Sequence, residues 1–394
     1  MSESPYPPKF TQFLLSNGIE LSDVEAGKLP RFIRINPSCA DPNAVIEALE
    51  KETGSTCTSV DWMPHAMRFY SLDSSARISG CPAYESGDVY GIDVASAVAV
   101  IALGVESNDH VLDLCCAPGG KMCLIADIQG NSDDVVGTVT GVDISRARIS
   151  TCKSVLRKYK MRRFRLFEAD GTSFDVHAPS RVGKWTRPAS ISDEPADSAA
   201  NTSKSDSDTL TIPSKRKAEN GGVVENPAKK PIQTKVKPFH ATKLVIGDLQ
   251  IKSAALLYDK VLVDAECTHD GSIAHLKKCN QMGWEKFEAT FFDPAKMDNL
   301  ETLQRGLISN GFRLLKPGGI LVYSTCSFLK RQNEDIINWF LAANAGCAVL
   351  ESVPESDKFP VAKALTGESP HMLRFTPTAS NTSGLFVARI RKIE

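Results

Sequence analysis

The stretch from Val111 to Lys121, VLDLCCAPGGK, constrains the fold of this chain more than any other. Two apolar residues and Asp113 are followed by a turn of small residues, and an apolar run begins directly after Lys121. This pattern is typical of a buried strand that passes through a tight glycine turn into a helix. In an open α/β sheet such a junction lies at the carboxyl end of a strand, where ligands bind. We therefore predict a doubly wound α/β domain with a ligand site at residues 115–121.

The spacing of the glycines limits what this turn can bind. The G-x-G-x-x-G pattern of dinucleotide sites is absent, and Met122 stands where a phosphate-binding loop needs serine or threonine. Gly119 and Gly120 let backbone N–H groups approach a ligand without a Cβ in the way. The remaining common occupant is a nucleoside without a pyrophosphate, such as S-adenosylmethionine. A purely structural strand–turn–helix is the alternative.

Composition narrows the class of protein only moderately. The chain has 394 residues and a net charge of −1, so any nucleic-acid contact must depend on a local charge cluster. Its 11 cysteines are odd in number and follow no disulfide-scaffold spacing, which indicates a reducing compartment. With no long apolar run and no signal pattern at the N-terminus, we expect a protein of the nucleus, the cytoplasm or both, without membrane contact.

Changes in composition divide the chain into five segments. We expect a flexible N-terminal segment at 1–28, a small α+β module with possible RNA contact at 29–88, and an α/β domain in two parts, 89–176 and 243–394, around an insert at 177–242. The insert is rich in acidic, basic and small polar residues, so it cannot bury enough surface to offset chain entropy and is predicted to be disordered. Its basic clusters at 214–217 and 228–231 are spaced like a bipartite nuclear-import signal, with a solvated linker as the alternative.

Local patterns predict the order of the elements. Strands are expected at 32–36 and 66–72 in the small module, and at 111–113, 137–142, 164–168, 260–264, 320–323 and 384–390 in the α/β domain. Helices are expected at 44–53, 93–103, 145–159, 297–315 and 333–343, with Asp41 and Asn333 as N-terminal caps.

Two carboxylates stand at the ends of predicted strands. Asp143 ends the strand after the glycine turn, where a carboxylate is well placed for both ribose hydroxyls of a nucleoside. Asp170 follows the next strand and could reach the adenine amino group. The alternative for Asp143 is capping of the helix that follows.

Two cysteines also follow predicted strand ends, Cys267 after Asp264 and Cys326 within YSTCS. A thiolate is the best side-chain nucleophile at neutral pH once its pKa is lowered. C5 of cytosine becomes nucleophilic only after a thiolate adds to C6, and a second group then helps to release the product. Asp264 could bond the N3 or amino edge of such a base. The alternative is that each buried cysteine is only a small hydrophobic residue.

The same region also contains candidate metal ligands. Cys267, His269, His275 and Cys279 offer zinc-type ligands, but their spacing is irregular and lacks a C-x-x-C pair. We therefore expect no metal.

A basic run at 146–165 is the strongest candidate for an RNA contact. It contains nine lysines and arginines, and phosphate affinity grows with such contacts. A solvated helix face is the alternative.

Several of these stretches together resemble one family. VLDLCCAPGGK, the strand-end Asp143 and Asp170, DAECT at 264–268 and YSTCS at 323–327 are similar to the Sun/RsmB-type RNA (cytosine-5) methyltransferases. The resemblance covers roughly 89–175 and 243–392, and pairs an APGGK turn with a strand-end TCS. It implies a Rossmann-like methyltransferase sheet.

The resemblance also implies roles for individual residues. S-adenosylmethionine would be held by Cys115, Cys116, Ala117, Pro118, Gly119, Gly120, Lys121, Asp143, Asp170 and Asp264. Cys326 would be the nucleophile, Cys267 would help to release the product, and Asp264 would assist catalysis. The implied partner is RNA, either tRNA or rRNA, acted on by a monomer.

One departure from the family pattern matters for function. The family usually has proline before the first cysteine, and this chain has Glu266. A carboxylate beside a thiol is expected to raise the pKa of Cys267 and disfavour its thiolate. Two rival hypotheses remain: a catalytically impaired, RNA-binding scaffold, and a small-molecule methyltransferase, which needs no cysteine pair.

Overall fold

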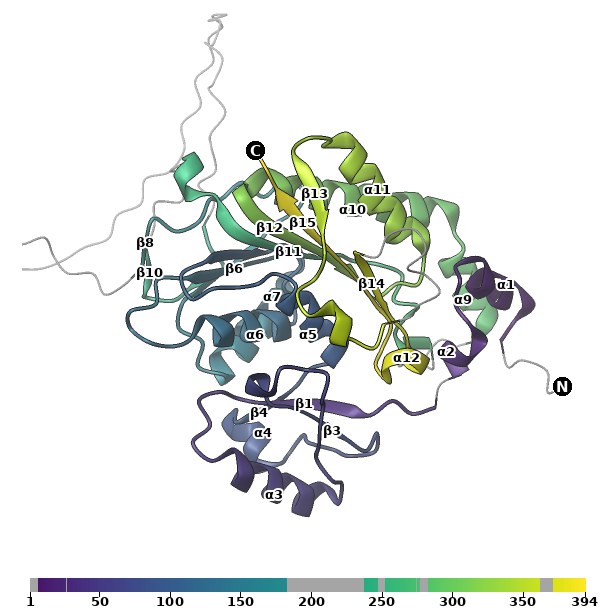
Figure 1. The fold of residues 1–394 in the computed structure, drawn as a ribbon, viewed down its shortest axis with the longest axis horizontal. Coiled ribbons are helices and arrows are strands. Elements are labelled where there is room, and N and C mark those ends of the chain that lie inside the picture. Colours follow the sequence, from purple (N-terminus) through teal and green to yellow (C-terminus); the bar gives the residue numbers. More distant parts are fainter. Residues whose placement is uncertain are drawn as a thin grey trace, which may run out of the picture. The chain divides into compact units, whose positions relative to one another are not determined.

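The computed structural model describes residues 6–25, 27–182, 237–246, 252–273, 275–276, 283–361 and 371–394. These residues form a large sheet with helices on both faces and a smaller sheet near the N-terminus (Figure 1). Most of the predicted insert, including both of its basic clusters, lies outside the described residues.

The large sheet contains nine strands among the described residues. Their order is β13 (Ala348–Glu351), β15 (Leu385–Lys392), β12 (Leu315–Thr325), β11 (Tyr258–Asp264), β5 (His110–Asp113), β6 (Thr138–Asp143), β7 (Phe164–Glu168) and β9 (His240–Ala241), with β14 (Met372–Phe375) paired to β15. The strands from β12 to β7 are parallel, whereas β15 and β9 run antiparallel to their neighbours. This arrangement confirms the predicted doubly wound α/β fold.

Helices cover both faces of the sheet (Figure 1). On one side lie α5 (Val94–Ile101), α6 (Gly120–Gln129) and α7 (Arg146–Lys158), and on the other α10 (Pro294–Leu314) and α11 (Glu334–Ala343). Within β5, Val111 packs into the apolar cluster of the first set and Leu112 into that of the second. Both residues are fully buried, because a parallel strand between two helical layers has no solvent face.

Residues 31–91 contain the predicted α+β module. Its sheet has the order β2 (Thr58–Ser59), β3 (Phe69–Leu72), β1 (Arg31–Ile35) and β4 (Val89–Gly91), with α3 (Pro42–Thr53), η1 (His65–Met67) and α4 (Pro82–Ser86). Asp41 caps α3 as predicted, since its carboxylate accepts the Ala44 N–H at 3.0 Å. The buried ion pair between Arg34 and Asp127 joins β1 to α6.

The N-terminal segment differs from its prediction as a flexible stretch. It contains α1 (Pro8–Ser16) and α2 (Leu21–Glu25), and Phe10 and Leu14 are completely buried. They pack in a cluster that includes Phe291 of α9 (Trp284–Phe291). A short amphipathic helix is ordered here because its apolar face meets a partner far along the chain.

The remaining elements are short. They are β8 (Arg181–Val182), which pairs with β10 (Val245–Ile246), and η2 (Ala254–Leu256), η3 (Lys330–Gln332), η4 (Ser356–Lys358) and α12 (Pro377–Ser380). The described ends of the predicted insert therefore contribute β8 and β9 to sheets. No helix in the described ranges is both long and apolar enough to cross a membrane.

Candidate active site

The carboxyl ends of the parallel strands bring the predicted site residues to one edge of the sheet. Asp264 of β11 is in register with Ser324 of β12, and Asp113 of β5 is in register with Gly141 of β6. The loops that follow these strands enclose a cavity of about 430 Å³. Its lining includes Cys115, Ala117, Pro118, Lys121, Asp143, Asp170, Asp264, Glu266, His269 and Cys326.

The glycine turn contributes to this cavity only in part. Cys116, Gly119 and Gly120 are not among the described residues that line it. Gly119 has a φ of +106°, and a Cβ there would come within 3.0 Å of the Cys152 sulfur in α7. This glycine is therefore required for close packing of the turn on α7, rather than only for approach to a ligand as the sequence suggested.

Asp143 and Asp170 both line the cavity, and each uses one oxygen to shape its own turn. Asp143 Oδ1 accepts the Ser145 N–H at 2.9 Å, and its Oδ2 lies 3.5 Å from the Arg148 guanidinium. Asp170 Oδ1 accepts the Thr172 N–H at 2.8 Å. Ser145 is the N-cap residue of α7. Asp143 therefore does not cap this helix, and its carboxylate instead bonds to the backbone of the cap residue.

Lys121 and Asp264 form an ion pair beside the thiols. Lys121 Nζ lies 2.6 Å from Asp264 Oδ2, and Ser324 donates to Asp264 Oδ1 at 2.7 Å. Burial lowers the pKa of Lys121, but the Asp264 carboxylate outweighs it and the net shift is upward. Burial also raises the pKa of neighbouring Asp113 to about 7. Because both oxygens of Asp264 are engaged, its direct contact with a base would require one of these bonds to open.

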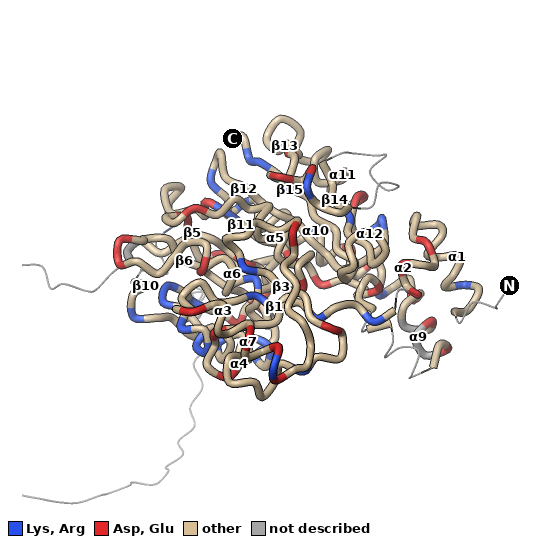
Figure 2. The backbone as a smooth tube through the Cα atoms, turned by 60° about the horizontal axis from the view of Figure 1, so that its bottom comes forward, with Lys and Arg blue, Asp and Glu red and all other residues tan. Residues whose placement is uncertain are grey.

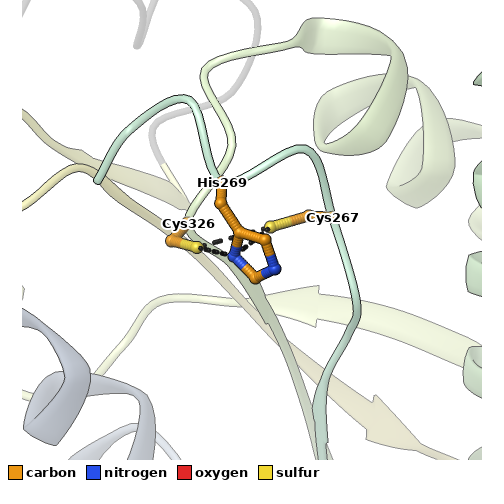
Figure 3. Close-up of side chains that lie close together, drawn as sticks. All are labelled: Cys267, His269 and Cys326. Carbon is orange, nitrogen blue, oxygen red and sulfur yellow. Dashed lines mark hydrogen bonds between the residues drawn. The ribbon is translucent and has the colours of Figure 1, made fainter. Parts of the chain in front are cut away.

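The side chains of Cys267, Cys326 and His269 converge (Figure 3). Of the three, Cys326 and His269 line the cavity. The two sulfurs are 3.4 Å apart. His269 Nδ1 lies 3.0 Å from the Cys326 sulfur and 3.7 Å from the Cys267 sulfur. The register of β11 and β12 places the thiols together, since each follows a paired strand end by two or three residues.

Hydrogen bonds hold the two cysteine loops in this arrangement. The buried Asp270 carboxylate accepts the Ser327 hydroxyl at 2.9 Å and the Phe328 N–H at 2.8 Å. Asn333 stands at the N-cap position of α11 as predicted, but its side chain makes no capping hydrogen bond. Its amide instead accepts the Thr325 hydroxyl at 2.6 Å and donates to Ser327 O at 2.8 Å, so it fixes the turn that carries Cys326.

The thiols have opposite pKa shifts. Hydrogen bonds from Cys267 and from His269 lower the pKa of Cys326, although burial opposes them. The hydrogen bond to Cys326, followed by burial, raises the pKa of Cys267 well above its usual value. The hydrogen bond to Cys326 also raises the pKa of His269. Cys326 is therefore the thiol with thiolate character, and Cys267 stays protonated beside it.

Glu266 does not act on Cys267 in the way that the sequence suggested. The pKa of Cys267 is raised, but by Cys326 and by burial first. Glu266 is exposed, and its carboxylate instead favours the protonated form of His269.

The three side chains are close enough to raise the question of a metal. Their sulfur and nitrogen atoms lie within 4.8 Å of one another. Tetrahedral zinc would separate two thiolate sulfurs by about 3.8 Å, and a sulfur from an imidazole nitrogen by about 3.5 Å. The observed 3.4 Å between the sulfurs and 3.0 Å between His269 and Cys326 are shorter, as hydrogen bonds are. The distances therefore fit a hydrogen-bonded group better than zinc ligation; Cys279 of the zinc alternative lies outside the described residues.

A second cavity of about 380 Å³ adjoins the first at Cys326. Its lining includes Asp93, Ser272, His275 and Ser383, and it shares His269 and Cys326 with the first cavity. Asp93 accepts the Ala95 N–H at 2.9 Å and the Ser383 N–H at 3.2 Å. The thiol of Cys326 thus faces two compartments.

The predicted basic run divides into exposed and buried parts. Lysines and arginines follow one another along α7 and beyond it (Figure 2). Arg146 and Arg157 are exposed, whereas Arg163 and Arg165 are buried and bonded inside the domain. The burial follows from β7, where Arg165 donates to Thr140 Oγ1 at 2.9 Å. Only the part on α7 and just after it remains available to a phosphate backbone.

The fold and the site define a Rossmann-like domain of the methyltransferase class. A family model described as 16S rRNA methyltransferase RsmB/F matches residues 100–183 and 228–391. The chain belongs to this family, which confirms the resemblance found in the sequence.

Named relatives agree with this assignment. Ribosomal RNA small subunit methyltransferase F of Serratia proteamaculans is 33% identical over 336 residues, which are 84% of this chain and 51% of that protein. The protein of the same name from Shewanella amazonensis is 36% identical over 135 residues, 34% of this chain and 26% of its own length. The chain thus spans about half or less of these relatives.

Solved structures support the fold. NSun6 from Pyrococcus horikoshii with SFG has a TM-score of 0.65 at 14% identity, over 99% of each chain. A methyltransferase homolog protein from the same organism has a TM-score of 0.58 at 20% identity, over 98% of this chain and 100% of that one.

His269 is the main site residue that sequence reasoning missed. It entered only as a possible zinc ligand, although it follows Cys267 by two positions. The ion pair of Lys121 with Asp264 was also not foreseen.

Proposed function

We propose that this protein methylates C5 of cytosine in RNA and takes the methyl group from S-adenosylmethionine. The observation that carries this proposal is the group of Cys267, His269 and Cys326. His269 and Cys326 line both cavities, and Cys267 is buried behind them. One cavity suits the methyl donor, and the other suits a single base turned out of its RNA strand.

The larger cavity fits a nucleoside better than a phosphorylated cofactor. Among the described residues, four carboxylates line it, and two of them, Asp143 and Asp170, lie at the ends of neighbouring strands. Carboxylates favour hydroxyl and amino groups and disfavour phosphates. Asp143 would hold the ribose hydroxyls and Asp170 the adenine amino group. Cys116, Gly119 and Gly120 would support the turn from behind. The NSun6 structure contains SFG, an S-adenosylmethionine analogue, in the same fold.

The residues at the junction have the properties that cytosine C5 chemistry needs. S-adenosylmethionine supplies an electrophilic methyl group when it is bound. The Cys326 thiolate would add to C6 of the base, which moves electron density onto C5. Cys267 would help to release the methylated product. Asp264 would orient the base after its bond to Lys121 or to Ser324 opens. The exposed carboxylate of Glu266 is not among the main causes of the raised pKa of Cys267, so this pKa gives no support to the impaired scaffold.

RNA is the proposed substrate class, with tRNA and rRNA as the candidate species. The relatives are named for ribosomal RNA, and exposed lysines and arginines lie on and just after α7. We propose that these residues and the module of β1 to β4 contact the RNA backbone.

The test is to incubate the purified chain with labelled S-adenosylmethionine and total RNA, and then to digest the RNA to nucleosides. Label is expected in 5-methylcytosine, and Cys326→Ala is expected to abolish it. Label in another nucleoside would contradict the proposed position of methylation. Label that persists after loss of both Cys267 and Cys326 would favour the small-molecule or another non-covalent class of methyltransferase.

A further inference from the structure

The Nδ1 atom of His269 forms a triangle with the sulfurs of Cys267 and Cys326 and is nearer to Cys326. It lies 3.0 Å from the Cys326 sulfur, a direct hydrogen-bond distance for sulfur. The ring also borders both cavities. The His269 ring therefore approaches the proposed nucleophile, Cys326, from the side on which the two cavities lie.

The backbone fixes this position. His269 has a φ of +57°, in the left-handed region that most residues avoid. The neighbouring residues hold the turn, because Thr268 N–H donates to Gln332 at 3.1 Å and Gly271 N–H donates to Cys326 O at 2.9 Å. A non-glycine residue persists in such a conformation when its surroundings determine it.

The charges around Cys326 and His269 favour loss of the thiol proton of Cys326. The groups that act on Cys326 or His269 are Cys267, Asp264, Lys121, Glu266 and Asp270. Asp93 and His275 line the second cavity together with Cys326 and His269. Glu266 and Asp270 stabilise a positive charge on His269. Lys121 offsets the negative charge of Asp264, which would otherwise oppose a thiolate.

We propose that His269 is a catalytic base that takes the thiol proton of Cys326 before RNA binds, leaving an imidazolium–thiolate pair. The S–H bond of Cys326 breaks and an N–H bond forms at His269 Nδ1, so no other reactant is needed. This inference rests on the proposed function and adds to that function the residue that activates the nucleophile.

The proton balance closes over a turnover. The sulfur electron pair forms the bond to C6 of the base, and the imidazolium keeps its proton. When the adduct is resolved, C5 of the methylated base loses its proton to water. The C5–H electron pair then forms the C5–C6 double bond, and the C6–S electron pair returns to sulfur beside the same imidazolium. The pair is thus restored without a proton from elsewhere.

The direct test is the pH dependence of Cys326 alkylation by iodoacetamide in the full chain, followed by peptide mass mapping. The variant is His269→Asn, because asparagine tolerates a left-handed backbone and carries no titrating nitrogen. At pH 6.5 we expect Cys326 to react about tenfold or more slowly in the variant, with its pH midpoint about one unit or more higher. At pH 9.5 both proteins should react at similar rates, because the thiol then ionises unaided.

Two comparisons separate this role from a structural one. His275→Asn, which alters a histidine 5.9 Å from the His269 ring, should keep the wild-type alkylation profile. In the methylation assay, the acid limb of the His269→Asn profile should move upward and activity should return at high pH.

The inference is wrong if His269→Asn leaves the alkylation profile of Cys326 unchanged, or if the loss is not restored at high pH. An equal shift in His275→Asn would also overturn it. Alkylation needs no RNA, so a chain that shows the alkylation shift but methylates no RNA would contradict the proposed function and leave this inference standing.

Discussion

The protein contains two close pairs of thiols in very different surroundings. Cys116 and Cys152 have sulfurs 4.0 Å apart, between the glycine turn and α7. Cys267 and Cys326 have sulfurs 3.4 Å apart, between the loops after β11 and β12. The two thiol pairs therefore have similar sulfur–sulfur distances but different chemistry.

The difference lies in what surrounds each pair. Cys116 and Cys152 are buried among apolar side chains, and burial raises the pKa of Cys116 well above its usual value. Cys326 instead has an imidazole at 3.0 Å and faces two cavities. A thiol becomes a nucleophile through a polar partner and access to substrate, and not through proximity to another thiol.

The largest expected effect is the loss of the nucleophile. Cys326→Ala should lower the methylation rate by on the order of a thousandfold or more, to background, because no other described thiol faces both cavities. The measurement is transfer of labelled methyl groups to RNA. Cys152→Ala is the matched control from the other pair and should keep most of the activity. If the two variants lost equal activity, the contrast between the pairs would be invalid.

The next effect concerns the cofactor cavity. Asp143→Ala removes a buried carboxylate from its lining and should weaken S-adenosylmethionine binding by about tenfold to a hundredfold. Calorimetric titration measures this change. Asp133→Ala alters an exposed carboxylate outside the cavity lining and should leave the affinity unchanged. Unchanged binding in Asp143→Ala would remove this residue from the proposed site.

A smaller effect is expected in the pH profile of the wild-type protein. The pKa of Cys326 is lowered, so its thiolate is present above that lowered value and is lost as the pH falls through it. Methylation should therefore persist about one unit or more below the usual thiol pKa of about 8.5. An acid limb at or above pH 8.5 would show that Cys326 is an ordinary thiol.

The smallest effect should come from the buried pair. Cys152→Ala removes one sulfur from a fully buried position and should lower the free energy of unfolding by about 1–2 kcal/mol. Denaturant unfolding measures this loss. The rate of alkylation of Cys326 should not change, whereas a clear decrease would mean that the two pairs are coupled.

Sequence reasoning succeeded where function depends on local pattern. The run at 111–121 predicts β5, its turn and α6, because apolar strands and glycine turns are local signals. Asp143, Cys267 and Cys326 were located for the same reason, since each lies at or just after the end of a recognisable strand. Parallel strands then bring such ends together without further information.

Sequence reasoning failed where a residue depends on a distant partner. His269 reaches Cys326 only because Asp270 and Gln332 fix the loop around it. Asn333 resembles a helix cap in sequence, but its amide bonds to the turn before the helix. The helices at 8–25 pack on Ile273, Leu276 and Phe291, a contact that no local pattern can indicate.

The most direct test uses an RNA in which the target cytosine carries fluorine at C5. That base can accept the thiolate and the methyl group, but it has no C5 proton to lose, so the adduct cannot be released. Mass spectrometry of the digested complex should find the nucleotide attached to Cys326 and to no other residue. Attachment elsewhere, or turnover of the normal RNA with no trapped complex, would contradict the assignment of Cys326 as the nucleophile.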